Sequence, residues 1–162
     1  KLSLSADSAP SQIGWAAVGQ DKDTVTPMQM CMIVSGIANG GVVKQPKLVK
    51  SSPLAVSNLT GALQDTRIMS ADTAQTIAQM MEEVVKTGTG TRAAIDDITV
   101  CGKTGTAEVG GSQKSHAWFV GFIRDADHPL AVTVIVENGG SGGRVAAPIA
   151  KKVLETALKQ GY

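Results

Sequence analysis

Apolar residues recur with the period of an α-helix in three separate stretches of the chain. In the first stretch Thr26 is a predicted N-cap, Pro27 suits the first helical position, and Gln29 completes a capping box. Apolar side chains then occupy nearly every side, which predicts a deeply buried helix that stops at the Asn-Gly-Gly of residues 39–41. Residues 1–25 show no sustained period and are predicted to be irregular.

Two further helices are predicted from apolar stripes at i, i+3, i+4 and i+7 spacing. The middle helix starts after Ser70 and ends at Gly88, with a stripe of Ala74, Ile77, Ala78, Met81, Val84 and Val85. The last helix follows the glycine-rich run 139–143 and is expected to bury Val145, Ile149, Val153, Leu154 and Ala157. Between the first two helices, a short extended segment is predicted around Pro46, which Val42–Val43 and Leu48–Val49 flank. A polar connector is predicted over residues 50–69.

The pattern changes to strand-like runs after residue 97. Ile98–Thr104, Ala117–Ile123 and Leu130–Val136 are rich in β-branched and aromatic residues, and turn residues separate them. Connections this short join antiparallel strands, so the three runs predict a meander. The order helix, helix, three strands, helix is that of an α+β fold in which helices flank an antiparallel sheet. Because one helix over three strands makes a thin core, the first strand is expected to have a further neighbour.

Composition narrows the functional classes. The chain has 162 residues, of which 43% are hydrophobic and 18% charged, so a packed core is expected rather than disorder. A net charge of +1 and 3% aromatic residues give no basic or stacking surface for nucleic acid. No apolar run approaches the ~20 residues of a membrane span. Two cysteines and two histidines at unrelated positions predict no metal or cofactor site; Cys31 and Cys101 are interpreted as buried small residues, with a disulfide left open.

One tetrapeptide, Lys-Thr-Gly-Thr, occurs twice, at residues 86–89 and 103–106. The first copy falls at the end of the middle helix, where Lys86 complements the helix dipole. The second lies on the first predicted strand, where a lysine among apolar residues either faces solvent on an edge strand or has a functional role. A phosphate-binding loop is excluded, because Asp97 stands where that pattern needs a glycine and a strand follows instead of a helix.

In this context the second copy resembles the third motif of the penicillin-binding protein and serine β-lactamase superfamily, whose motifs are Ser-x-x-Lys, Ser-x-Asn and Lys-Thr-Gly. In that superfamily the third motif lies on a strand of the active-site cleft, followed by two antiparallel strands and a helix. Further segments resemble the monofunctional, class B branch: Gly19-Gln20, residues 26–30 (Thr-Pro-Met-Gln-Met), 37–41 (Ile-Ala-Asn-Gly-Gly), 88–91 (Gly-Thr-Gly-Thr) and 118–122 (Trp-Phe-Val-Gly-Phe). The resemblance implies that the three strands belong to a larger, five-stranded sheet.

Two of the three motifs are missing. No Ser-x-x-Lys and no Ser-x-Asn occurs anywhere in the sequence. The resemblance therefore implies that residues 1–162 are the C-terminal part of a single transpeptidase domain, whose N-terminal part would carry the nucleophile and be a partner. The isolated chain is predicted to be inactive. The parent protein is expected at the extracytoplasmic face of the bacterial membrane, or in the periplasm, held only by an N-terminal anchor outside this chain.

The resemblance also implies roles for the second tetrapeptide. The reaction would be acyl transfer from a D-Ala-D-Ala stem peptide of peptidoglycan, with β-lactams as mimics that acylate the same serine. Lys103 would attract the substrate carboxylate and help relay a proton, and Thr104 and Thr106 would bind that carboxylate through their hydroxyls. Gly105 would let the substrate backbone approach, and the Thr106 N–H would be an oxyanion donor.

Alternative functions of the same fold are a β-lactam-binding sensor domain and a serine β-lactamase. Upstream sequence would separate the sensor from the synthase, and residues 26–29 and 88–91 favour a synthase over a hydrolase. The other polar candidates are not predicted to take part in catalysis. His116 is interpreted as a surface histidine at a strand end, Glu108 as structural, Arg144 as a possible groove edge, and residues 139–143 as a flexible connector.

Overall fold

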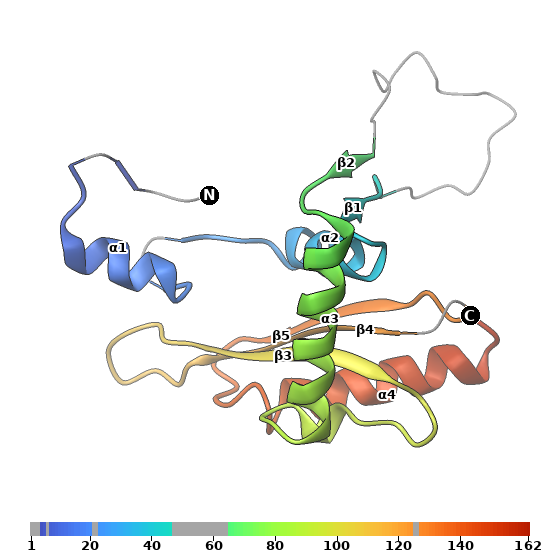
Figure 1. The fold of residues 1–162 in the computed structure, drawn as a ribbon. Helices are drawn as coiled ribbons and strands as arrows, with labels where there is room; N and C mark the ends of the chain where they lie inside the picture. The colour runs from blue at the N-terminus through green and yellow to red at the C-terminus, as the bar shows by residue number, and fades with distance from the viewer. Residues whose placement is uncertain (1–3, 6, 21–22, 47–64, 125–126) are drawn as a thin grey trace, which may run out of the picture.

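A three-stranded antiparallel sheet lies at the centre of the molecule (Figure 1). The computed structural model describes residues 4–5, 7–20, 23–46, 65–124 and 127–162. The strands are β3 (Val100–Ala107), β4 (His116–Ile123) and β5 (Ala131–Val136), in the order β3-β4-β5. The predicted meander and the α+β class are confirmed. Both β3 and β5 are edges of this sheet among the described residues, so a further neighbour for the first strand, and a five-stranded sheet, stay predictions.

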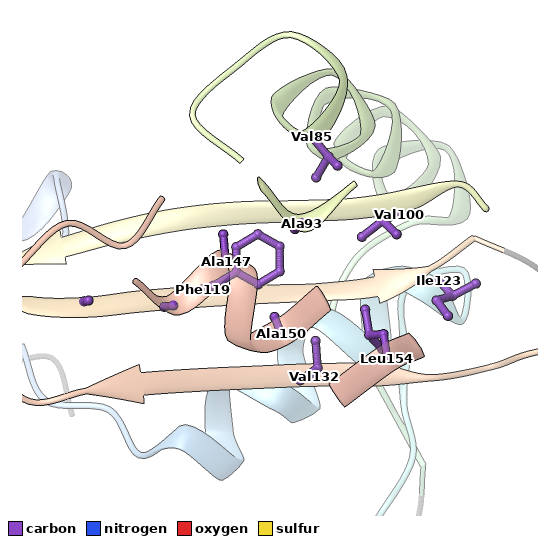
Figure 2. Packing of buried hydrophobic residues seen from close by; sticks show 11 residues of the cluster. Val85, Ala93, Val100, Phe119, Ile123, Val132, Ala147, Ala150 and Leu154 are labelled. Carbon is purple, nitrogen blue, oxygen red and sulfur yellow. The ribbon is translucent and has the colours of Figure 1, made fainter. Parts of the chain in front are cut away.

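Each face of the sheet carries its own core. On one face α4 (Ala146–Lys159) packs against β4 and β5, and Phe119 is the largest side chain of a cluster that also holds Val100 and Leu154 (Figure 2). On the other face α2 (Pro27–Ala38) and α3 (Ala71–Lys86) enclose Cys101, Val120 and Phe122. Successive residues of β4 thus alternate between the two cores, as the period of a strand requires.

The cap residues of two helices were predicted correctly. Thr26 Oγ1 accepts from the Gln29 N–H at 3.1 Å, and Gln29 Oε1 accepts from the Thr26 N–H at 2.9 Å. At α3, Ser70 Oγ accepts from the Thr73 N–H at 3.1 Å. The predicted burial of the first of these helices is wrong in part: only Val34, Gly36 and Ile37 of α2 are buried, whereas Met28 and Ile33 are 55% and 39% exposed.

The buried face of α4 also differs from the prediction. Ile149 and Val153, expected in the stripe, are 40% and 50% exposed. The residues that contact the sheet include three fully buried alanines, Ala146, Ala147 and Ala150, together with Leu154. Small side chains let the helix lie close to β4 and β5, so the helix turns its alanine side, not its larger apolar side, towards the core.

Two elements lie where irregular chain was predicted. Residues 10–17 form α1 (Pro10–Ala17), which buries no residue and stands apart from the sheet in Figure 1. Residues close in sequence determine where α1 starts. Pro10 is the first helical residue, and Gln12 Oε1 accepts from the Ala9 N–H at 3.0 Å. Within the expected polar connector, β2 (Thr66–Arg67) pairs antiparallel with β1 (Val42–Val43). The predicted extended segment Leu48–Val49 lies outside the described residues.

One short 3₁₀ turn completes the described elements. The turn η1 (Thr91–Ala93) follows α3 and contributes the fully buried Ala93 to the α4-side core. The longest described helix, α3, has 16 residues. Within the described ranges, no helix combines the length and the apolar character needed to cross a membrane.

Candidate functional site

The second Lys-Thr-Gly-Thr lies on β3, whose outer edge has no strand partner among the described residues. The Arg124 N–H donates to the Thr99 carbonyl at 2.8 Å, so residues 99 and 124 form a hydrogen-bonded pair across β3 and β4. Such pairs alternate along an antiparallel ladder. The backbone groups of Lys103 and Gly105 therefore face β4, whereas those of Thr104 and Thr106 point out of the open edge.

Lys103 brings a positive charge to this edge. Its side chain is exposed, and Nζ donates to the outward carbonyl of Thr104 at 2.8 Å. Lys103 is paired with Val120, so the side chain leaves the strand on the face covered by α2 and α3 and then bends back to the edge. The lysine that the sequence left ambiguous thus stands on an edge strand, with its ammonium group beside the outward backbone.

The two threonine hydroxyls lie on the opposite face of the same strand. Thr104 Oγ1 is 2.7 Å from Thr89 Oγ1, in the loop that follows α3. Thr106 Oγ1 accepts from the Gly142 N–H, with the two atoms 3.5 Å apart. The open edge of β3 therefore has an ammonium group on one side, two hydroxyls on the other, and outward N–H and C=O groups between them.

Gly105 and its neighbour Gly102 differ in the room around them. A Cβ on Gly102 would lie 2.3 Å from the ring of Phe119, so this glycine is required by packing. A Cβ on Gly105 would lie 3.1 Å from Trp118 Cβ, a tight contact that a small shift can relieve. Packing therefore accounts for Gly102 and leaves Gly105 only partly explained.

The glycine-rich run after β5 is part of the site's support, not the flexible connector that was predicted. A Cβ on Gly142 would be 2.3 Å from the carbonyl oxygens of Gly105 and Trp118. A Cβ on Gly143 would be 2.4 Å from the Thr89 carbonyl oxygen. The two glycines thus let this loop press directly on β3 and on the loop after α3, because a side chain at either position would collide with backbone.

The first Lys-Thr-Gly-Thr copy contains a lysine with a structural partner. Lys86 forms an i,i+4 ion pair with Glu82, which also contacts Arg124 beyond β4, with Oε2 and Nη1 2.7 Å apart. These partners, Lys86 first and then Arg124, lower the pKa of Glu82, and Glu82 raises the pKa of Lys86. The ion network fixes α3 to the end of β4, which agrees with the interpretation of Lys86 as a helix-end residue.

The cysteines do not form a disulfide. Both Cys31 and Cys101 are free thiols, and burial raises the pKa of Cys101 to about 11, so this side chain stays protonated. Among the described residues no group of three or more His, Cys, Asp or Glu side chains could hold a metal ion.

The remaining candidates are His116, Glu108 and Arg144. His116 Nδ1 accepts from the Asn138 N–H at 3.0 Å, so the ring secures the turn after β5. Glu108 is exposed just beyond β3, and the Arg144 carbonyl oxygen accepts from Arg92 Nη1 at 3.5 Å.

A pocket of about 580 Å³ lies at the other end of the sheet, lined by residues that include Asn39, Phe122 and Arg124. None of Lys103, Thr104, Gly105 and Thr106 lines it, so its size does not mark it as the reaction site.

Two contacts to the edge strand have no signal in the sequence patterns. One is the Thr89 hydroxyl described above. The other is Gln20, whose Nε2 donates to the outward Thr106 carbonyl at 3.3 Å, although 86 positions separate the two residues. Both residues lie in segments that resemble the class B branch, Gly19-Gln20 and residues 88–91, but the resemblance implies no contact of either residue with β3.

Comparisons with known proteins identify the family and the fold. The penicillin-binding protein transpeptidase domain matches residues 3–155. Peptidoglycan D,D-transpeptidase PbpA of Mycolicibacterium smegmatis is 34% identical over 160 residues, which are 92% of this chain and 32% of that protein. The D,D-transpeptidase domain of a peptidoglycan glycosyltransferase from Eggerthella lenta superposes with a TM-score of 0.77 at 33% identity, covering 91% of this chain and 38% of that one.

A further solved relative is an acyl-enzyme. Penicillin-binding protein A of M. tuberculosis, as its imipenem acyl-enzyme complex, superposes with a TM-score of 0.76 at 32% identity and covers 93% of this chain and 34% of its own. The present chain thus spans about a third of the length of these relatives.

Proposed function

Because this chain belongs to the penicillin-binding protein transpeptidase family, we propose that it forms the substrate-binding and oxyanion wall of a peptidoglycan D,D-transpeptidase. The observation that carries the proposal is the open edge of β3, where Thr104 and Thr106 turn their backbone groups outward beside the Lys103 ammonium group. Support also comes from similar proteins that are named peptidoglycan D,D-transpeptidases, and from similar structures that are acyl-enzymes of imipenem and penicillin G.

The acyl donor would pair with β3 as an added strand. An extended peptide that docks on a free sheet edge gains backbone hydrogen bonds there. The Thr106 carbonyl is the acceptor that such a peptide would use, and it already accepts from the Gln20 carboxamide at 3.3 Å. Gly105 lies between the two outward-facing threonines, where the absence of a side chain keeps the edge accessible.

The reaction divides into two acyl transfers. A serine Oγ attacks the carbonyl carbon of the D-Ala-D-Ala peptide bond, and the C–N bond breaks as the leaving D-Ala nitrogen takes up a proton. The ester so formed is then attacked by an amine of a second stem peptide, which restores the serine hydroxyl. During each attack the outward Thr106 N–H would donate to the negative oxygen, a contact that is typically worth ~3 kcal/mol.

Lys103 would act by its charge. Its ammonium group, at the same edge as the Thr106 N–H, would attract the terminal carboxylate of the donor and help transfer the proton to the leaving nitrogen. The hydroxyls of Thr104 and Thr106 would donate to that carboxylate. For this the bond between Lys103 Nζ and the Thr104 carbonyl must be exchanged for contacts with substrate.

The nucleophile would come from outside residues 1–162, because the sequence has no Ser-x-x-Lys and no Ser-x-Asn. We infer that these residues are the C-terminal part of a single transpeptidase domain and that the N-terminal remainder is the partner which completes the site. Residues 1–162 alone would then have no activity. Because peptidoglycan lies outside the cytoplasm, the complete site would act at the extracytoplasmic face of the bacterial membrane or in the periplasm, and an N-terminal anchor would hold the parent protein there.

The test is D-Ala release from a D-Ala-D-Ala donor peptide by the full-length protein with an acceptor amine present. We expect a cross-linked product, and we expect Lys103→Ala to slow acylation by well over tenfold. Lys114→Ala, in the loop between β3 and β4, is the matched control and should change the rate by less than twofold. Equal rates for wild type and Lys103→Ala would remove Lys103 from the mechanism, and rapid hydrolysis of β-lactams without cross-linking would indicate a β-lactamase.

A further inference from the structure

The two Lys-Thr-Gly-Thr copies meet in the structure through their threonines. Thr89, the last residue of the first copy, has its Oγ1 2.7 Å from Oγ1 of Thr104, the second residue of the other copy. This is a full-strength hydroxyl hydrogen bond by distance. It joins the loop after α3 to the face of β3 that carries the carboxylate-binding hydroxyls of the proposed function.

Backbone contacts hold Thr89 in this place. The Gly88 and Gly90 N–H groups both donate to the Val84 carbonyl, at 3.1 and 3.0 Å, so the loop closes tightly over the end of α3. On the other side Gly143 abuts the Thr89 carbonyl, where a Cβ would come within 2.4 Å. The same glycine lies 3.7 Å, measured from its would-be Cβ, from Thr104 Cγ2. Thr89 is therefore fixed by its neighbours before any substrate arrives.

A threonine hydroxyl has one hydrogen to donate and two lone pairs. If Thr104 donated its hydrogen to Thr89, it would have only lone pairs to offer an incoming carboxylate, which repel the negative charge. If Thr89 donates to Thr104, the Thr104 hydrogen is free to bond to the carboxylate. A chain of two hydroxyls ending on an anion also strengthens each bond in it.

We propose that Thr89 is a positioning residue that donates to Thr104 and so directs the Thr104 hydroxyl hydrogen to the carboxylate of the acyl donor. This inference rests on the proposed function, because it requires Thr104 to contact that carboxylate. It gives the loop 87–91 a role in binding the anion of the substrate, although Thr89 itself does not touch the substrate.

The experiment measures acylation of the full-length protein by penicillin G and by its neutral methyl ester, separating the dissociation constant from the acylation rate constant. Thr89→Val keeps the shape and removes the hydroxyl. We expect it to raise the dissociation constant for penicillin G by about fivefold, the scale of one hydrogen bond. The acylation rate constant, and both constants for the ester, should stay within twofold of wild type.

Two variants serve as controls. Thr89→Ser restores the hydroxyl and should restore the affinity for penicillin G. Thr87→Val removes a hydroxyl from the same loop, one that donates to Glu83 at 2.7 Å and not to β3, and should leave both constants unchanged. In a Thr104→Val background, adding Thr89→Val should cause no further loss of affinity, because the two hydroxyls act in series.

Two results for Thr89→Val would overturn the inference. One is an unchanged dissociation constant for penicillin G, and the other is an equal rise for the acid and the ester, which would indicate a merely structural role. If Thr89→Val does not fold, Thr89→Cys takes its place, since a thiol is a weak donor of similar size, and wild-type affinity in that variant would overturn the inference as well. Wild-type protein that neither compound acylates would overturn the proposed function together with this inference.

Discussion

Gly102 and Gly105 lie on the same strand, β3, but have different roles. Gly102 is required by the packing of the core. A Cβ at this position would lie 2.3 Å from Phe119 Cζ, and Phe119 is fully buried in the core under α4. We predict that Gly102→Ala lowers the free energy of unfolding by about 1–3 kcal/mol, the range of overpacked core positions. Urea unfolding measures this difference, and a loss below 0.5 kcal/mol, about the level of a surface substitution, would contradict the contact.

Gly105 is the contrasting position on the same strand. Its Cβ would meet only Trp118 Cβ at 3.1 Å, so Gly105→Ala should cost less than ~1 kcal/mol of stability. In the full-length protein we expect the same variant to slow acylation by a fluorescent penicillin by at least ~10-fold, because the methyl group narrows the edge used by the added strand. If Gly105→Ala lost stability and kept its acylation rate, the assignment of this glycine to substrate binding would be wrong.

The sequence predicts the second tetrapeptide as part of the site because four adjacent residues on a predicted strand form the pattern, and the structure confirms that they lie on β3. Thr89 and Gln20 could not be assigned contacts with the edge strand in this way. They reach Thr104 and Thr106 across 15 and 86 positions, and neither lies in a periodic pattern. Contacts of this kind depend on how distant segments meet in space, which no local pattern records.

At the level of elements, helix starts were predicted more accurately than helix faces. Thr26 and Ser70 cap their helices through atoms within three residues, so local sequence determines them. Which face is buried depends on the neighbouring layer. At α4 the predicted Leu154 is buried and Val145 packs against the core, but Ile149 and Val153 are 40% and 50% exposed, and alanines occupy the rest of the buried face, so hydrophobicity alone identified the stripe only in part. Helix α1 was not predicted, because its start rests on a local cap and no residue in it is buried.

The ion network between α3 and β4 predicts a pH dependence of stability. Lys86 and Arg124 lower the pKa of Glu82, so the folded state binds fewer protons than the unfolded state in the acid range. The stabilisation is complete above the ordinary glutamate pKa, about 4.3, and is lost as the pH falls through the lowered value. Glu82→Gln should lower the free energy of unfolding by up to about 1 kcal/mol at neutral pH.

Urea unfolding across the acid range measures this effect. The curves of wild type and Glu82→Gln should converge as the pH falls below the ordinary glutamate pKa. Glu83→Gln is the control, because glutamine can still accept the bond from Thr87 and the substitution should change stability little. A constant gap between wild type and Glu82→Gln at every pH would show that the charge of Glu82 is not the cause.

At the scale of the whole molecule, helices α1 and α2 expose large apolar side chains. Trp15 on α1 is 57% exposed and Met28 on α2 is 55% exposed. Since the chain spans about a third of its relatives' length, we expect the N-terminal remainder to cover them. The Trp15 signal is the difference between the Trp118→Phe variant and the Trp118→Phe/Trp15→Phe variant, and iodide should quench it several-fold less in the full-length protein than in residues 1–162. Equal quenching in both would contradict this.

In the proposed domain this chain contributes the binding strand, and another part of the protein contributes the nucleophile. Intact-mass analysis of the full-length protein after reaction with penicillin G, followed by peptide mapping, identifies the acylated serine. We predict one covalent penicilloyl group per molecule, on a serine that precedes residues 1–162, and none on residues 1–162 treated alone. A penicilloyl group on any serine within residues 1–162 would contradict the account.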